Sequence, residues 1–238
     1  MAVIKSISAA VAAAVLVSVP ALSPAAVLVQ YTFDGYTQPA SSGTAQGPFD
    51  ASTVNADATA TQLASTGQNI NVKSGGTHNA NSTSATLPVL RVPSPVTADA
   101  IDISKYFEFA VAPKSGYVLD LTNITFQAAS NTTGNQKFEV RYSFDGFANS
   151  FTAGSGTTNA AAAFTYDNFS FNLLDANAGA NETTGTTTFR FYNYNSGGVN
   201  PATYDNITVN GAVSAVPEPA SLGLLGVAGA MFLRRRRA

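Results

Sequence analysis

Short segments in which apolar and polar side chains alternate with a period of two constrain this fold more than any other feature of the chain. Within residues 137–147, KFEVRYSFDGF, one face carries Phe138, Val140, Tyr142 and Phe144. The opposite face carries Glu139, Arg141 and Ser143. This period is that of a β-strand with one buried face, and the Asp145-Gly146 pair after it predicts a tight turn.

Two other segments repeat the pattern. Residues 106–113 place on the buried face Phe107, Phe109 and Val111. In residues 187–194, the inward side chains are Phe189 and Phe191. The outward side chains are Arg190, Tyr192 and Tyr194. Both segments therefore predict antiparallel strands that are buried on one side.

Residues 117–128 break the alternation once. Leu119 and Leu121 share a parity that the next apolar residues, Ile124 and Phe126, do not share. A β-bulge adds one residue to a strand and so exchanges its two faces. We therefore expect a bulge or a bend near Thr122 or Asn123.

The body of the chain shows no helical period, and its short strands are separated by turn-forming residues. This organisation predicts an all-β fold, a single jelly-roll-like β-sandwich over residues 26–213. Residues 27–31 are expected to open the sandwich and residues 204–213 to close it. Residues 37–86 contain few bulky apolar side chains and predict either long loops or weak edge strands.

Composition excludes several classes of function. Apart from Lys5 and the four C-terminal arginines, the chain has seven basic residues against 14 acidic ones. Such a body would repel a phosphate backbone, so no nucleic-acid partner is expected. The chain has no cysteine, which excludes disulfides, thiolate nucleophiles and most zinc sites.

The N-terminus has the layout of a secretory signal peptide over residues 1–25. Lys5 supplies the positive charge, residues 7–19 are apolar, and small residues lead to a cleavage site after Ala25 or Ala26. A retained N-terminal membrane anchor is the alternative, and the apolar core is short for it.

The C-terminal residues 214–238 form a second signal. Pro217-Glu218-Pro219 precedes an uncharged segment that, as a helix, would span only about 22 Å of a hydrocarbon layer of about 30 Å. A cluster of four arginines follows, Arg234, Arg235, Arg236 and Arg237. This cluster favours a cytoplasmic C-terminus and places the body on the other side of the membrane.

This tripartite tail resembles the PEP-CTERM sorting signal of Gram-negative bacteria that make exopolysaccharide. The resemblance implies that an exosortase in the membrane recognises Pro217, Glu218 and Pro219 during export. It also implies a transient or retained C-terminal membrane anchor at the cell surface or in the extracellular matrix. A permanent single-span anchor after a chance Pro-Glu-Pro is the alternative.

The sequence offers little for catalysis, and we expect no enzyme activity. Its single histidine, His78, lies in a polar loop, and no nucleophile elbow is present. Glu108 and Glu139 point outward on predicted strands and would have to lie about 5 to 10 Å apart to act as a glycosidase pair. No metal or other cofactor is expected, although structural calcium at the strand ends is an alternative for Asp34, Asp145, Asp167 and Asp205.

The outward side chains of two strands form the candidate ligand site. Aromatic rings stack on sugar faces, and arginine hydrogen-bonds sugar hydroxyls. The candidate glycan-binding residues are Arg141, Arg190, Tyr192 and Tyr194, joined by Glu139. An ordinary solvated sheet face is the alternative.

These observations predict an exported, non-catalytic structural or adhesive component of the exopolysaccharide layer. A carbohydrate-binding module and a secreted glycan-active enzyme are the alternatives. The expected partners are signal peptidase and exosortase during export, the membrane transiently, and exopolysaccharide.

Overall fold

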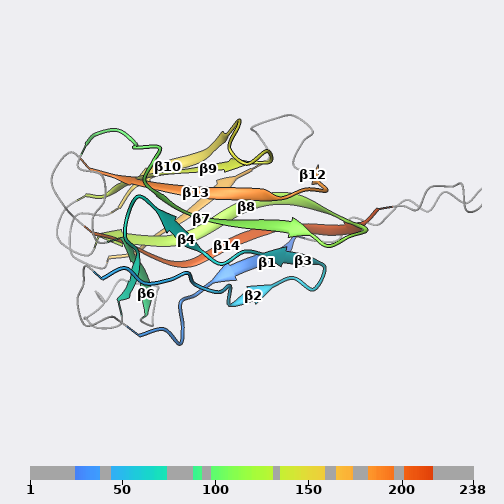
Figure 1. Cartoon of the computed structure of the whole chain (residues 1–238), viewed down its shortest axis with the longest axis horizontal. Coiled ribbons are helices and arrows are strands. Elements are labelled where there is room, and N and C mark those ends of the chain that lie inside the picture. The colour runs from blue at the N-terminus through green and yellow to red at the C-terminus, as the bar shows by residue number, and fades with distance from the viewer. Residues whose placement is uncertain are drawn as a thin grey trace, which may run out of the picture.

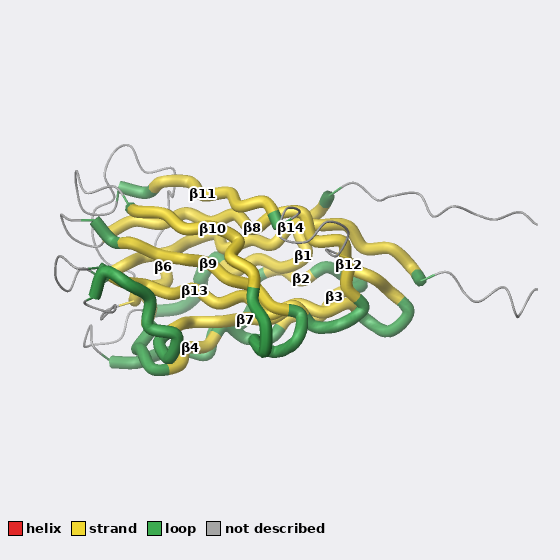
Figure 2. Tube along the Cα trace, turned by 90° about the horizontal axis from the view of Figure 1, so that it is seen from above, coloured by secondary structure: helices red, strands yellow, loops and turns green. Residues whose placement is uncertain are grey.

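The computed structural model describes residues 25–37, 44–73, 88–92, 98–130, 135–158, 165–173, 182–195 and 201–216. These residues form β-strands and loops, and none of them lies in a helix. The strands make two sheets that pack face to face (Figures 1 and 2). The predicted all-β sandwich is confirmed.

One layer is an eight-stranded sheet. Its strands are β1 (Ala26–Tyr31), β2 (Thr53–Val54), β5 (Asn71–Lys73), β6 (Val89–Val92), β8 (Tyr117–Ser130), β11 (Asp167–Asn172), β12 (Glu182–Thr183) and β14 (Ala202–Ala215). Their order is β11-β8-β14-β1-β2, while β12 also pairs with β8, and β6 joins β14 to β5. Strand β11 therefore lies at one edge, next to β8.

The other layer is a six-stranded sheet. Its strands are β3 (Ala58–Ala60), β4 (Ala64–Thr66), β7 (Tyr106–Pro113), β9 (Lys137–Ser143), β10 (Phe151–Thr157) and β13 (Thr187–Tyr194). Their order is β10-β9-β13-β7-β3, and β4 also pairs with β7. Neighbouring strands are antiparallel, which explains the clean alternation of buried and outward side chains in the sequence.

Aromatic rings from both sheets fill the space between the layers. Phe107 stacks on Phe191 with ring centroids 4.6 Å apart, and Phe126 from the opposite sheet meets Phe191 edge-on at 5.2 Å. Tyr204 closes the same cluster from β14. The predicted inward residues are buried, among them Phe107, Phe109, Val111, Phe138, Val140, Tyr142, Phe189, Phe191, Ile207 and Val209. Burial of each such side chain stabilises the fold by about 1.5–3 kcal/mol.

The predicted bulge lies at Thr122. Asn210 of β14 faces Asn123 of β8, but the next residue, Gly211, faces Leu121, so Thr122 has no opposite residue. The extra residue lets Leu121 and Ile124 both face the core. Gly211 is required beside it, because a Cβ there would lie 2.3 Å from the backbone oxygen of Asp120.

The two sheets approach closely at the β10–β11 edge. A Cβ at Gly154 of β10 would lie 2.5 Å from the ring of Phe171 of β11. Glycine therefore makes room for the ring. This contact joins the edges of the two layers, and Figure 2 shows β10 and β11 next to each other along one side of the molecule.

Residues 44–73 contain four short edge strands rather than one long loop. Strands β2, β3, β4 and β5 have two or three residues each. An isolated bridge pairs Phe49 with Leu63, and both side chains are fully buried. Of the two predicted alternatives for residues 37–86, weak edge strands are present in the described part.

Candidate functional site

Both ends of the folded domain lie at one end of the sandwich. Strand β1 begins at Ala26, which faces Gly211 of β14. Strand β14 then continues about 13 Å farther, to Ala215. Ala215 pairs with Tyr117. Figure 1 shows the end of β14 beside the β7–β8 hairpin.

The folded domain extends to Val216. The backbone N–H of Val216 donates to the carbonyl oxygen of Gly116 at 2.8 Å, so the paired backbone runs past the expected domain end at residue 213. The predicted signal peptide, the apolar C-terminal helix and the following residues lie outside the described residues: Pro217, Glu218, Pro219, Arg234, Arg235, Arg236 and Arg237. No helix within the described ranges is long and apolar enough to cross a membrane.

The predicted ligand-binding residues share the outer face of the six-stranded sheet. Arg190 of β13 lies between Glu108 of β7 and Arg141 of β9 in cross-strand register. Tyr192 lies opposite Glu139 in the next outward row. We call the following six residues the outer-face cluster: Tyr106, Glu108, Glu139, Arg141, Arg190 and Tyr192.

Arg190 is held in place from three sides. Its Nε donates to Glu108 Oε2 at 2.7 Å. Its guanidinium carbon lies 4.0 Å from the ring centroid of Tyr106 and 3.9 Å from that of Phe147. The cation therefore lies between two aromatic rings, which restricts its motion and orients its remaining N–H groups.

Tyr192 departs from the prediction of an exposed aromatic platform. It points away from the core, yet only 2% of its surface is exposed. The guanidinium of Arg141 lies 5.6 Å from its ring centroid, and the ring of Tyr106 meets it edge-on at 5.8 Å. Burial raises the pKa of the Tyr192 phenol, so this group is neutral at physiological pH. The expectation of an exposed Tyr192 is wrong, because neighbouring long side chains cover its ring.

Tyr194 and Lys137 extend the outer-face cluster by one row. They face each other across β13 and β9, and the side chain of Tyr194 is partly exposed. Lys137 forms an ion pair with Asp99, and this hydrogen bond raises the pKa of Lys137. The Lys137–Asp99 ion pair therefore lies at the end of this row.

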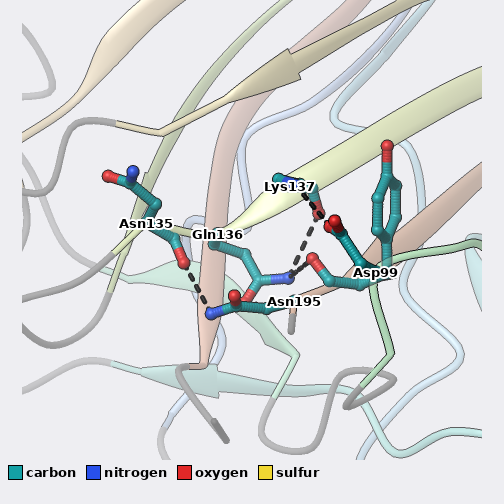
Figure 3. A network of polar contacts seen from close by, with 6 residues as sticks. Asp99, Asn135, Gln136, Lys137 and Asn195 are labelled. Atoms are coloured by element: carbon teal, nitrogen blue, oxygen red, sulfur yellow. Dashed lines mark hydrogen bonds and ion pairs between the residues drawn. The ribbon is translucent and has the colours of Figure 1, made fainter. Parts of the chain in front are cut away.

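Figure 3 shows the polar network that supports this row. Gln136 donates from Nε2 to the carbonyl oxygens of Tyr194 at 2.9 Å and Lys137 at 3.1 Å. Asn195 donates to the carbonyl oxygen of Asn135 at 2.6 Å. These bonds connect the start of β9 with the end of β13.

A shallow pocket of about 350 Å³ lies beside Glu108. Its lining comes from β7, from Thr188 of β13 and from the segment between β3 and β4, namely Thr61, Gln62, Ala64, Glu108, Phe109, Ala110 and Thr188. The pocket combines hydroxyl, amide and carboxylate groups with apolar side chains. Such a lining suits a ligand that carries many hydroxyl groups.

The two candidate carboxylates lie on different strands, and each is paired with an arginine. Glu108 and Glu139 lie on strands β7 and β9, which are separated by β13, and their cross-strand rows differ by one. This register separates their Cα atoms by roughly 12 Å. Each carboxylate is bonded to its own arginine, since Arg141 Nε donates to Glu139 Oε1 at 2.5 Å. The geometry gives no support to the glycan-active enzyme.

The aspartates at the strand ends act within turns where their contacts are described. Asp145 accepts hydrogen bonds from Ser143 Oγ at 2.8 Å and from the backbone N–H of Asn149 at 3.0 Å. Asp205 Oδ1 accepts from the backbone N–H of Asn206 at 2.8 Å. Among the described residues, no group of three or more histidines and carboxylates could hold a metal ion. His78 lies outside these residues.

The prediction missed three members of this surface. Tyr106 and Phe147 contact Arg190, and Asp99 pairs with Lys137. Tyr106 has the outward parity of Glu108, so the alternation of β7 could have indicated it. Phe147 and Asp99 lie in loops, where no periodicity places a side chain.

Comparisons with known proteins identify the C-terminal segment. The family model of the PEP-CTERM protein-sorting motif matches residues 215–237, so the chain carries this motif directly after β14. The motif supports an exported, cell-surface-sorted protein. No curated protein matches the chain.

Several solved structures resemble the domain distantly. The CBM22-1 xylan-binding domain from Paenibacillus barcinonensis has a TM-score of 0.42 at 10% identity, with 83% of this chain and 100% of that chain covered. The K3 cleaved adhesin domain of Lys-gingipain from Porphyromonas gingivalis has a TM-score of 0.37 at 14% identity, with 78% and 98% covered. A family 11 carbohydrate-binding module from Clostridium thermocellum has a TM-score of 0.36 at 10% identity, with 77% and 96% covered.

Proposed function

We propose that this chain is exported through its PEP-CTERM motif and serves as a non-catalytic structural or adhesive component of the exopolysaccharide layer. The observation that carries the proposal is the position of the motif, which begins at residue 215, where β14 ends. A short apolar segment with a terminal arginine cluster suits handling by a membrane enzyme such as an exosortase.

The arrangement of the two ends supports the same proposal. The signal peptide would be attached before Ala26, and the sorting signal follows Ala215. Both attachment points lie at the same end of the sandwich. Both ends can therefore meet one membrane while the rest of the sandwich extends away from it. The ion-paired carboxylates of the outer-face cluster favour a non-catalytic role.

The sorting proposal is tested by replacing Pro217, Glu218 and Pro219 with alanine in the producing bacterium. We expect the variant to accumulate in the inner-membrane fraction, while the unaltered protein reaches the surface or the medium. A variant with Ala220 and Ser221 replaced by other small residues is the control. Equal surface amounts for both variants would contradict the proposal.

Carbohydrate binding at the outer-face cluster is the second candidate function. It is favoured by the fixed position of Arg190 between two rings, because a donor that is already ordered loses little entropy when it binds a hydroxyl group. The shallow pocket beside Glu108 extends this polar surface.

A glycan array with the exported protein tests this second function. Saturable binding that is lost in Arg141→Ala and Tyr194→Ala would support it. Asn210→Ala, on the outer face of the other sheet, is the matched control and should bind normally. Binding that survives both substitutions would place the ligand elsewhere and contradict it.

A further inference from the structure

Strand β11 ends one side of the eight-stranded sheet, and beyond Asp167 at its start it lacks the features that usually protect an edge. Residues 168–172 contain no charge and no proline, and their pairing with β8 has no register shift. Natural edge strands are typically blunted by charges, prolines, bulges or short length. The neighbouring edge strand β10 has a bulge between Thr152 and Gly154, and β2 at the far edge has only two residues.

The open side of β11 offers a regular row of backbone groups. Leu173, which continues the register, donates its N–H to the carbonyl oxygen of Thr122 at 2.9 Å. Hydrogen-bonding direction alternates along an antiparallel strand. Asn168, Ser170 and Asn172 therefore direct their N–H and C=O groups away from β8. Among the described residues, no strand pairs with β11 on that side.

The sequence of this strand reads the same in both directions. Residues 168–172 are Asn-Phe-Ser-Phe-Asn. If two copies pair antiparallel about a two-fold axis at Ser170, asparagine faces asparagine, phenylalanine faces phenylalanine and serine faces serine. This register is isologous and self-complementary, as closed dimers require.

The side chains fit this pairing on both faces. Phe169 and Phe171 are only partly buried, so a second copy would cover more of their rings. On the outer face, Asn210 of β14 donates to Asn123 of β8 at 2.9 Å. From β8, Gln127 donates to Asn168 at 3.1 Å and Asn123 donates to Ser170 Oγ at 3.4 Å. These uncharged amide contacts already reach β11, and the partner's asparagines would continue them.

We propose that a second copy of this chain pairs with β11 and makes one continuous sheet across two molecules. The symmetric register adds about six backbone hydrogen bonds, two for each hydrogen-bonded pair. The axis is perpendicular to the sheet, so both six-stranded layers stay on the same side and the dimer is one longer sandwich. The inference is independent of the sorting signal and of glycan binding.

Charge variants at the axis test this pairing. The full chain in mild detergent is followed by sedimentation velocity at rising concentration. The unaltered protein is expected to dimerise, and Ser170→Lys to weaken dimerisation at least about tenfold, because like charges face each other at the axis. Thr59→Lys, on β3 at the opposite edge of the six-stranded sheet, is the control and should dimerise normally.

The fold of the variant is checked independently. Ser170 is exposed and directs its backbone away from β8, and its hydroxyl accepts only one long hydrogen bond, from Asn123 at 3.4 Å, so Ser170→Lys should remain folded with an unfolding temperature close to that of the unaltered chain. An equimolar mixture of Ser170→Lys and Ser170→Glu should restore the dimer, because opposite charges then meet. A monomeric unaltered chain, or a Ser170→Lys variant that dimerises as before, would overturn the proposal.

A cross-link gives a second readout, since the chain has no cysteine of its own. Ser170→Cys should form a disulfide-linked dimer under mild oxidation, and Thr59→Cys on the distant strand β3 should not. Failure of Ser170→Cys to cross-link, or equal cross-linking at both positions, would also overturn the proposal.

Discussion

Arg190 donates a 2.7 Å hydrogen bond to Glu108 across strands β13 and β7, and this pair anchors the centre of the outer-face cluster. The side chain of Arg190 is 20% exposed and that of Glu108 is 33% exposed, so the pair is partly shielded from water. The two rings that flank Arg190 add packing to the charge pair.

Arg190→Ala should lower the free energy of unfolding by about 1–2 kcal/mol, because it removes the ring contacts together with the ion pair. Arg190→Lys should lose less, since it keeps the charge but not the planar group. Urea denaturation measures both changes. An Arg190→Ala protein as stable as the unaltered one would show that the cluster adds nothing to the fold.

Tyr204→Phe should lower the free energy of unfolding by about 1–3 kcal/mol, because it leaves a buried acceptor without its donor. Tyr204 is fully buried, and its hydroxyl donates to Asn193 Oδ1. Tyr194→Phe, at a partly exposed position, is the control and should cost less than about 0.5 kcal/mol. Equal stability of the two variants in thermal unfolding would contradict the inferred role of this bond.

Gly154→Ala should destabilise the fold by about 1–3 kcal/mol through overpacking, because the new methyl group would meet the ring of Phe171 at 2.5 Å. Gly185→Ala is the matched control, since its nearest neighbour would lie at 3.7 Å. Differential scanning calorimetry of both variants measures the difference. Identical melting temperatures would show that the sheets do not approach closely at β10 and β11.

Asp145 should titrate at a lower pH than an unstructured aspartate, whose pKa is about 3.9. Hydrogen bonds from Asn149 and Ser143 lower the pKa of Asp145 by stabilising its charged form. Because the pKa of Asp145 is lower in the folded state than in the unfolded state, its carboxylate stabilises the fold at pH values above the unfolded-state pKa. This stabilisation is lost as the pH falls through the folded-state pKa.

NMR titration of the Asp145 carboxyl group measures this pKa directly. Ser143→Ala removes one donor and should raise the midpoint toward that of a free aspartate. A midpoint at or above the free value in the unaltered protein would refute the proposed hydrogen bonding in this turn.

The alternation of side chains predicted the central strands and their buried faces because burial on one side imposes a period of two. It also predicted an irregularity near Thr122 or Asn123, and the structure has a bulge at Thr122 that lets Leu121 and Ile124 face one core. Strands β10 and β11 were not predicted. In β10, glycines and small polar residues hide the period. Glycine is needed there because aromatic rings approach closely, that of Phe171 at Gly154 and those of Phe138 and Phe169 at Gly156.

The candidate site was predicted only in part. The alternation of side chains predicted that Arg141 and Arg190 lie on one face of the sheet, and the structure confirms this. Parity says nothing of what covers a side chain, so it could not show that Tyr192 is buried beneath its neighbours. Nor could it place Phe147, whose position depends on the loop after β9.

Mass spectrometry of the C-terminal peptide of the protein collected from outside the cell tests the central claim most directly. Sorting through the PEP-CTERM motif predicts a mature chain that keeps β14 through Ala215 and lacks the arginines at positions 234–237. Extracellular protein that still ends with the intact arginine cluster would contradict the account.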